Sequence, residues 1–355
     1  MIFHVVALPH TQVNGSFPAC AFNEKVRKFC IMLHELGGHE LYLYAGDRSS
    51  APCTEAIACI TEAERVACLD GRHYTEASFD NRDPHWVKFN DTVVAEMAKR
   101  IGPRDFICVI GGLAHKPVAD AFPNHMVVEF GIGYPGTFAP YRVFESYAWM
   151  HSIYAVLGFS PDLTTQPDGR FFDDVIPSYF EAEKFPWSEE TEDYYLFIAR
   201  LNARKGLEIA QETCQKMRAR LIVAGPGDFY GYGEYVGVID HEIRGQLMSK
   251  AVALFSPTIY IEPFGSVHVE ANLCGTPVIT TDWGVYTETV TNGFNGYRCR
   301  MAREFTDAAK LCRDLDRAAI RSDAQSKYSL EVIAQRYESY FNRLQTLWDK
   351  GFYSI

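Results

Sequence analysis

The chain has 355 residues, of which 47% are hydrophobic and 22% are charged, and its formal net charge is −11. These proportions are those of a folded globular protein, and the length is sufficient for two domains, each with its own core. The acidic balance disfavours a broad surface for nucleic acids or anionic membranes, although it allows a local basic groove.

Cysteine usage and hydropathy bear on the compartment. The ten cysteines are scattered and form no CxxC pair, which favours reduced, buried thiols over disulfides or a zinc site. Met1 to Pro9 is predicted to be a strand rather than a signal peptide, and no stretch reaches the roughly 18 apolar residues that span a bilayer. We therefore expect a cytoplasmic protein without an integral membrane segment.

The first half of the chain alternates short apolar runs with amphipathic segments. Ile2 to Leu8 is an apolar run, and a helical pattern that includes Phe22 ends at Gly37 and Gly38. The other strands expected here are 40–44, 56–60, 106–110, 126–130 and 175–177, and the other helices are 84–100, a short one near Val118, and 143–157. This order predicts a parallel sheet with helices on its faces.

Two motifs in this half resemble known signatures but lack their context. His34-Glu-Leu-Gly-Gly-His39 resembles a zinc-protease motif, yet its histidines are five residues apart and its glycines break the required helix. Gly131-Ile-Gly133-Tyr-Pro-Gly136 matches the dinucleotide pattern, but Pro135 and Pro140 oppose an immediate helix. We interpret it as a flexible glycine loop at the carboxyl end of a strand, where ligands bind in open α/β sheets.

The second half begins after a polar, acidic segment from Pro177 to Asp193, which is the best linker candidate. The expected strands are 194–199, 220–224, 235–239, 252–255, 278–281 and 296–299, and the expected helices are 207–217, 242–250, 266–273 and 306–315. These elements predict a second doubly wound sheet. We place the domains at 1–186 and 187–329, and expect a final helix (Leu330 to Trp348, within 330–355) to cross back onto the first domain.

The segment from Glu262 to Ile279 is the most informative part of the sequence. It is predicted to form a loop, a short helix capped by Ser266 and ended by Gly275, and a strand. Glu262 then lies in the loop, and Glu270 lies about one turn inside the helix. A loop carboxylate beside a helix N-terminus suits a sugar phosphate. The alternative is a surface turn with two solvated acids.

Further polar groups are predicted to gather near this helix. The amides of Gly265, Ser266 and Val267 would point outward at the positive end of the helix dipole, where an anion such as a diphosphate binds. Arg200 follows the first strand of the second sheet, and Lys205 precedes the next helix. Either cation alone is best interpreted as a solvated loop residue. Together with the two glutamates, they favour a diphosphate site.

The second half resembles the nucleotide-sugar domain of the family 4 glycosyltransferases, which have the two-domain GT-B fold. The matching residues are Arg200-Leu-Asn-Ala-Arg-Lys205-Gly206, Val223-Ala-Gly225-Pro-Gly227, the two glutamates with Gly265 between them, Gly275-Thr-Pro-Val-Ile, and Val175-Ile-Pro177-Ser before the linker. The resemblance covers about residues 175 to 300, whereas the first half matches only in layout. In general character the chain is also similar to glycosyltransferases of bacteriophage genomes, whose compartment would be the host cytoplasm.

This resemblance implies a metal-independent, retaining glycosyltransferase without a further cofactor, whose two doubly wound, Rossmann-like α/β domains face each other across a cleft. The first domain would bind the acceptor, and the second would bind a nucleotide-diphosphate sugar. The implied catalytic residues are Arg200 and Lys205, which would stabilise the departing diphosphate, and Glu262, which would bind hydroxyls of the donor sugar. The other implied donor-binding residues are Gly225, Val238 and Ile239 (the last two against the base), the amides of Gly265, Ser266 and Val267, and Glu270 on the ribose.

The sequence departs from the family pattern in its first half. His10-Thr-Gln-Val-Asn14-Gly15-Ser16 replaces the usual paired glycine after the first strand, and Gly131 or Gly133 stands where many members have a histidine on the donor sugar. His10 and His115 are weak substitutes for that histidine. Asp314-Leu-Asp316, a DxD, falls within a predicted helix and is interpreted as surface.

Three interpretations stay open on the sequence alone. The acceptor is a glycan, a protein, a lipid, a small molecule or modified DNA. A nucleotide-sugar epimerase or hydrolase of the same fold is the nearest rival enzyme, and it would turn over the donor without an acceptor. A non-catalytic protein that binds sugar nucleotides is the rival from another class, and a donor-hydrolysis assay separates it from an enzyme.

Overall fold

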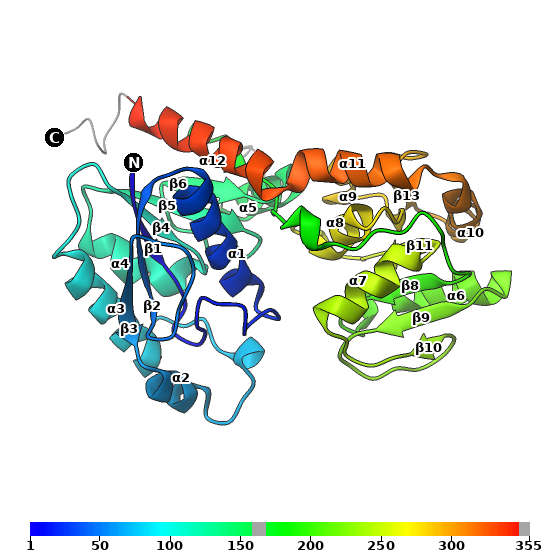
Figure 1. Ribbon diagram of the computed structural model, residues 1–355, viewed down its shortest axis with the longest axis horizontal. Helices are drawn as coiled ribbons and strands as arrows, with labels where there is room; N and C mark the ends of the chain where they lie inside the picture. Colours follow the sequence, from blue (N-terminus) through cyan, green and yellow to red (C-terminus); the bar gives the residue numbers. More distant parts are fainter. Residues whose placement is uncertain (158–167, 348–355) are drawn as a thin grey trace, which may run out of the picture. The chain divides into compact units, whose positions relative to one another are not determined.

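The computed structural model describes residues 1–157 and 168–347, and the chain divides into two compact units (Figure 1). The first unit comprises Met1–Glu145, Ile153–Tyr179 and the chain from Leu330 onward. The second comprises Ser146–Ser152 and Phe180–Ser329. The described residues contain no helix that is long and apolar enough to cross a membrane.

The first unit contains a seven-stranded sheet in the order β3-β2-β1-β4-β5-β6-β7, and every pair of neighbouring strands is parallel. Its strands are β1 (Ile2–Val6), β2 (Glu40–Gly46), β3 (Glu55–Ile60), β4 (Phe106–Val109), β5 (Met126–Ile132), β6 (Tyr141–Phe144) and β7 (Asp174–Val175). Its helical elements are α1 (Ala21–Cys30), η1 (Ile31–Leu36), α2 (Glu62–Leu69), η2 (Tyr74–Glu76), α3 (Pro84–Met97), η3 (Gly112–His115), α4 (Lys116–Ala121) and α12 (Leu330–Gln345), and α5 (Tyr147–Leu157) is shared between the units.

Helices cover both faces of this sheet. On one face a cluster of buried residues joins the strands to α3 and α4, and it includes Val6, Phe89 and Val118. On the other face α1 and α12 bring aromatic rings onto the strands, with Phe29 stacked on Phe130 at 4.0 Å and Phe341 edge-on to Phe3 at 4.7 Å between ring centroids. The last helix is therefore part of the core of the first unit.

The second unit contains a six-stranded parallel sheet in the order β10-β9-β8-β11-β12-β13. Its strands are β8 (Tyr195–Ile198), β9 (Leu221–Ala224), β10 (Glu234–Tyr235), β11 (Ala253–Ser256), β12 (Val278–Thr281) and β13 (Gly296–Cys299). Its helical elements are η4 (Ala182–Lys184), η5 (Ala203–Lys205), α6 (Leu207–Met217), α7 (His241–Lys250), α8 (Ser266–Leu273), α9 (Tyr286–Thr289), α10 (Ala302–Leu311), η6 (Cys312–Asp314) and α11 (Arg317–Tyr328).

Alternating strand residues of this second sheet face two separate cores. Leu196 and Leu254 pack with residues of α7, α8 and α11, whereas Phe197 and Phe255 pack with residues of α6 and α10. Because helices cover both faces, the strands are apolar on both sides, as a buried parallel sheet requires. Both units are doubly wound, as the alternation of strands and helices predicted.

Three expectations from the sequence differ from the structure. The helix expected at 143–157 begins only at Tyr147, because Val143 and Phe144 are in β6 between β5 and β7. The strand expected at 235–239 is reduced to Glu234–Tyr235, and α10 spans Ala302–Leu311 rather than 306–315. The final helix was expected to reach Trp348, which lies outside the described residues.

The boundary between the units also differs from the expected division at residue 186. It falls after Tyr179, because Phe180 and Ala182 are buried in the core of the second unit and Phe185 packs against it. Ser146–Ser152 groups with the second unit although it comes from the first half of the chain, and no local pattern indicates this. Likewise, α2 and α11 were not anticipated.

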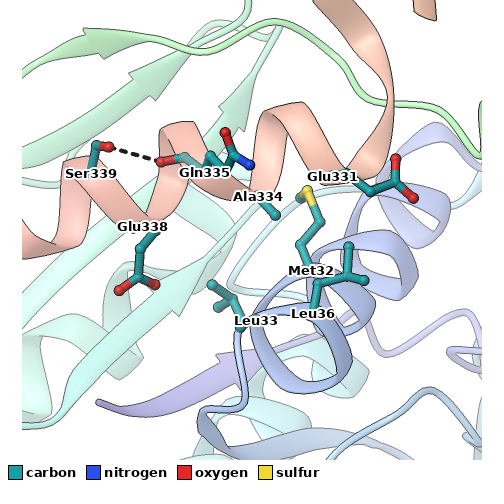
Figure 2. A pocket seen from close by; sticks show the side chains of 9 residues that line it. Met32, Leu33, Leu36, Glu331, Ala334, Gln335, Glu338 and Ser339 are labelled. Carbon is teal, nitrogen blue, oxygen red and sulfur yellow. Dashed lines mark hydrogen bonds between the residues drawn. The ribbon is translucent and has the colours of Figure 1, made fainter. Parts of the chain in front are cut away.

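A groove of about 580 Å³ lies in the first unit between η1 and α12 (Figure 2). Its sides combine apolar and acidic residues, among them Met32, Leu36, Glu331 and Glu338. None of the predicted site residues lines it. Size alone therefore does not identify the functional site of this protein.

A buried ion pair in the first unit supports a first prediction. Arg142 on β6 contacts Asp173 at 2.5 Å, and their side chains are 2% and 0% exposed. Replacing Asp173 with Asn leaves a buried guanidinium without its counter-charge and should lower the free energy of unfolding by about 3 to 5 kcal/mol. Asp174→Asn is the matched control, because its partner Arg343 is half-exposed and such pairs contribute about 0 to 1 kcal/mol. Equal losses in urea denaturation would contradict this assignment.

Candidate functional site

The second sheet reverses its strand order beside its first strand. β9 and β10 lie on one side of β8, whereas β11, β12 and β13 lie on the other. Ligands of doubly wound sheets bind beside the carboxyl ends of the strands at such a reversal. The loops that follow β8 and β11 are 199–206 and 257–265, and they carry the predicted residues Arg200, Lys205 and Glu262.

Two glycines let the backbones of neighbouring loops approach closely. Gly206 has φ 77°, and a Cβ there would lie 2.2 Å from the carbonyl oxygen of Pro257. Gly225, after β9, has φ 132°, and its Cβ would lie 1.9 Å from the carbonyl oxygen of Ala199. Both positions require glycine, because an L-residue would be strained and would collide with backbone. The loops after β9, β8 and β11 are thus packed backbone against backbone.

Glu262 is the centre of a polar cluster that joins two of these loops. Its carboxylate Oε2 accepts from Lys205 Nζ at 2.5 Å and from the hydroxyl of Tyr260 at 2.8 Å. Glu262 is only 8% exposed. A carboxylate at this depth needs such partners to offset its desolvation. Lys205, expected as a free cation for a diphosphate, is therefore paired with Glu262 in this structure.

Tyr260 also contacts the cations through its ring. The guanidinium carbon of Arg204 lies 4.6 Å from the ring centroid, and Lys205 Nζ lies 5.0 Å from it. Burial and the neighbouring Glu262 carboxylate raise the pKa of the Tyr260 phenol well above its ordinary value. The guanidinium of the exposed Arg200 forms no hydrogen bond or ion pair with the described residues, although its charge acts on Tyr260.

The turn before α8 differs in detail from the expectation. Ser266 was predicted to cap the helix, but it is the first helical residue, and Gly265 occupies the capping position with φ 73°. A Cβ on Gly265 would lie 2.8 Å from Cγ of Glu262, so glycine is required here also. The amides of Gly265, Ser266 and Val267 precede the first helical hydrogen bond and leave their donors available. The predicted anion-binding end of the helix is thus next to Glu262.

The side chain of His268 stabilises the turn before α8 through hydrogen bonds. Its Nδ1 donates to the carbonyl of Gly265 at 2.5 Å, and the hydroxyl of Thr289 lies 2.8 Å from its Nε2. Because Nδ1 carries the proton, Nε2 is an acceptor, and it shares the one proton of the Thr289 hydroxyl with the carbonyl of Val285, 3.1 Å from that hydroxyl. Burial lowers the pKa of His268 to about 4, so the imidazole is neutral near pH 7. His268 therefore has a structural role, which is to stabilise the turn before α8.

Glu270 lies inside α8 and is paired with a residue that the sequence analysis missed. Its carboxylate forms an ion pair with Arg244 of α7. Glu270 is 9% exposed, and α7 and α8 pack against each other. The carboxylate of Glu270 is therefore already oriented by a cation.

The expected base-binding residues lie in an irregular segment. Val238 and Ile239 follow β10 instead of belonging to it, and Val238 is 72% exposed. The carbonyl of Gly237 accepts from the amide of Gly225 at 2.9 Å. Gly225 directly follows β9, so this hydrogen bond holds Gly237, the residue before Val238, at the carboxyl end of β9.

Motifs left open by the sequence have structural explanations. Gly131 belongs to the end of β5 instead of a loop, and its carbonyl accepts from Lys25 Nζ at 3.0 Å. Asp316 of the DxD precedes α11 and caps it by accepting from the amide of Ala319 at 2.9 Å, so the motif runs from the end of η6 to the cap of α11 and is not within one helix. In the first unit, burial lowers the pKa of His10 to about 4. No group of three metal-binding side chains occurs among the residues that the structure describes.

Tyr260, Arg244 and His268 are the site residues that sequence reasoning missed. Tyr260 stands two residues before Glu262, a spacing that puts two side chains on one side of an extended segment, and this signal was present. Arg244 and His268 gave no comparable signal, because each acts through a partner brought close only by the fold.

The second unit is similar in sequence to known proteins. The family described as "Glycosyl transferases group 1" matches residues 180–318, which include all the predicted site residues. An uncharacterized glycosyltransferase of Methanocaldococcus jannaschii is 30% identical over 125 residues, which is 30% of this chain and 32% of that protein. The chain spans 29 to 45% of the lengths of the four curated relatives with significant matches.

Solved structures match almost the whole chain at low identity. The sucrose-phosphate synthase of Thermosynechococcus elongatus has a TM-score of 0.66 at 18% identity and covers 97% of this chain and 99% of its own. Anabaena HepE, in complex with UDP and glucose, has a TM-score of 0.61 at 15% identity and covers 98% and 100%. Similarity at this level shows a common fold, which is the GT-B fold with its two Rossmann-like units.

The buried imidazole of His268 predicts a dependence of stability on pH. Its folded pKa of about 4 lies below the unfolded value of about 6.5. As the pH falls from 6.5 to 4, the unfolded chain binds a proton that the folded chain does not, so the free energy of unfolding drops, by up to about 3 kcal/mol from this group. His268→Gln should be less stable than the wild type at pH 7, and the difference should shrink toward pH 4.

Urea denaturation of both proteins between pH 7 and pH 4 measures this effect. The other histidines whose pKa is lowered by burial, namely His4, His10, His85 and His115, contribute equally to both proteins and cancel in the difference. A difference in stability that stays constant over this range would mean that His268 is not the titrating group.

Proposed function

We propose that the chain is a retaining glycosyltransferase that moves a sugar from a nucleotide-diphosphate donor to an acceptor without a bound metal. The observation that carries this proposal is the cluster at the strand reversal of the second sheet. There Glu262 contacts Lys205 at 2.5 Å, beside the free amides at the start of α8 and near the unpaired Arg200. The family match over residues 180–318 supports it, because it spans this whole cluster.

The chemistry requires charge to be stabilised in two places. As the bond between the anomeric carbon and the phosphate oxygen breaks, negative charge grows on the diphosphate and positive charge grows on the sugar ring. Arg200, Lys205 and the amides of Ser266 and Val267 would stabilise the diphosphate, in the manner of preorganised donors. The acceptor oxygen then bonds to the anomeric carbon on the same face, and its proton passes to the departing phosphate oxygen.

We assign the remaining donor contacts as the family resemblance implies them. Glu262 would bind hydroxyls of the donor sugar, and Glu270, fixed by Arg244, would bind the ribose. Gly225, Val238 and Ile239 would contact the base at the carboxyl end of β9. The acceptor would be bound by the first unit, and its chemical class stays open.

Metal independence gives the next prediction. With UDP-glucose as the first donor to test, binding and turnover should persist in excess EDTA, because basic side chains and helix amides neutralise the diphosphate. A donor at 100 times its dissociation constant should stabilise the protein by about 2.7 kcal/mol, which a thermal-shift screen of nucleotide sugars detects. Activity abolished by EDTA and restored by Mn²⁺ or Mg²⁺ would refute metal independence. Donor turnover without any acceptor would favour the hydrolase or epimerase alternative.

A further prediction separates the two glutamates. Glu262→Gln should lower turnover strongly but should not weaken the binding of the free nucleoside diphosphate, because that ligand has no sugar and Lys205 is released to bind it. Glu270→Gln should weaken the nucleoside diphosphate itself by roughly 1.5 to 3 kcal/mol, the range for a charged hydrogen bond.

Calorimetry with UDP on both variants tests this division. Glu212→Gln is the matched control, since Glu212 lies on α6 with its side chain 70% exposed. If Glu262→Gln weakens UDP as much as Glu270→Gln does, the assignment of Glu262 to the sugar is wrong.

A further inference from the structure

Tyr260 contacts three charged side chains of the polar cluster, those of Glu262, Arg204 and Lys205. Its hydroxyl donates to Oε2 of Glu262 at 2.8 Å, the same oxygen that Lys205 contacts at 2.5 Å. The other carboxylate oxygen, Oε1, accepts no hydrogen bond from the described residues. Both protein donors therefore hold one oxygen of Glu262 and leave the other for a ligand.

The ring of Tyr260 has a separate set of partners. Arg204 and Lys205 lie within 4.6 and 5.0 Å of its centroid, distances at which a cation is attracted to an aromatic face. The amide of Ile259, the preceding residue, donates to the carbonyl of Arg204 at 2.9 Å. Two interactions therefore hold the loop after β11 to the loop after β8: this backbone hydrogen bond just before Tyr260, and the pair of Lys205 with Glu262 just after it.

The two contacts of Glu262 differ in what a donor does to them. A diphosphate carries more negative charge than one carboxylate, so it competes with Glu262 for the ammonium of Lys205. The hydroxyl of Tyr260, whose hydrogen bond runs to Glu262, is neutral, so a diphosphate attracts it less strongly than it attracts the ammonium. Once Lys205 turns to the diphosphate, Tyr260 is the group that still fixes the carboxylate.

We propose that Tyr260 is a positioning residue with two separable functions, its hydroxyl orienting Glu262 toward the donor sugar and its ring orienting Arg204 and Lys205 toward the diphosphate. The inference rests on the proposed function, since it concerns the same site. It assigns Arg204 as a further diphosphate contact. Tyr260 itself need not touch the donor.

Two substitutions separate these functions. Tyr260→Phe keeps the ring and removes the hydroxyl, so the affinity for UDP should stay within about two-fold while kcat with the active nucleotide sugar falls about ten-fold or more, the effect of one charge-assisted hydrogen bond. Tyr260→Leu removes the ring as well, so UDP should bind about three- to thirty-fold more weakly, the range of a cation–π contact.

A double-mutant cycle distinguishes positioning from a merely structural role. If Tyr260 acts through Glu262, adding Tyr260→Phe to Glu262→Gln should change kcat much less than it changes the wild type, because the contact it serves is already altered. Tyr232→Phe is the matched control. It also removes a phenolic hydrogen bond of 2.8 Å, to the carbonyl of Ala219 before β9, and should leave kcat and UDP affinity unchanged.

The outcomes are distinct. Unchanged kcat in Tyr260→Phe, or equal losses with and without Glu262→Gln, would overturn the positioning role while leaving the glycosyltransferase proposal intact. Unchanged UDP affinity in Tyr260→Leu would overturn the role of the ring. A wild-type protein that binds neither UDP nor any other nucleoside diphosphate would overturn both proposals. If Tyr260→Phe does not fold, Tyr260→Trp retains a ring without the phenol and should show the same kcat loss with UDP affinity retained.

Discussion

The ion pair between Lys205 and Glu262 is the interaction on which the candidate site depends. It joins the loops that follow β8 and β11, the two strands between which the sheet reverses its order. Because Glu262 is almost fully buried, separating the pair would leave an uncompensated charge, which is costly. The two loops are therefore held at a fixed distance by the same side chains that are suited to bind a donor.

The close approach of the loop backbones is a second constraint on the site, and it makes the pairing of Lys205 with Glu262 possible. Gly206 and Gly225 let the loops after β8 and β9 lie against Pro257 and Ala199 at distances that a Cβ would forbid. Gly265 similarly leaves room for the side chain of Glu262. Glycine at these positions has no side chain to collide with its neighbours, so its contribution to the site is steric rather than chemical.

The sequence predicted those parts of the structure that depend on local pattern. The bounds of α6 and α8 were correct, because apolar spacing and a following glycine or short polar turn are local signals. The rule that parallel strands end at one edge correctly brought Arg200, Lys205 and Glu262 to neighbouring loops. β6 was merged into a helix, because Val143 and Phe144 continue the apolar pattern and only their partner strands distinguish them.

Contacts between distant residues were beyond prediction for a different reason. Lys205 and Glu262 are 57 residues apart in the sequence, and each could be placed near the same edge without any sign that they pair. The same holds for Arg244 and Glu270, whose side chains meet because α7 packs on α8. The relative positions of the loops are set by the packing of the whole unit. No single segment of the sequence therefore indicates which side chains will pair.

The charge balance of the site has a consequence for the order of events under the proposed function. Lys205 is neutralised by Glu262, and Arg244 by Glu270, so the unpaired Arg200 and the amides of α8 are what a diphosphate meets first. The exchange of Lys205 from carboxylate to phosphate removes one donor from Oε2 of Glu262, so that this oxygen as well as Oε1 can accept hydroxyls of the sugar. Binding of the diphosphate and readiness of the sugar-binding carboxylate are then one coupled step, because a single ammonium serves both partners.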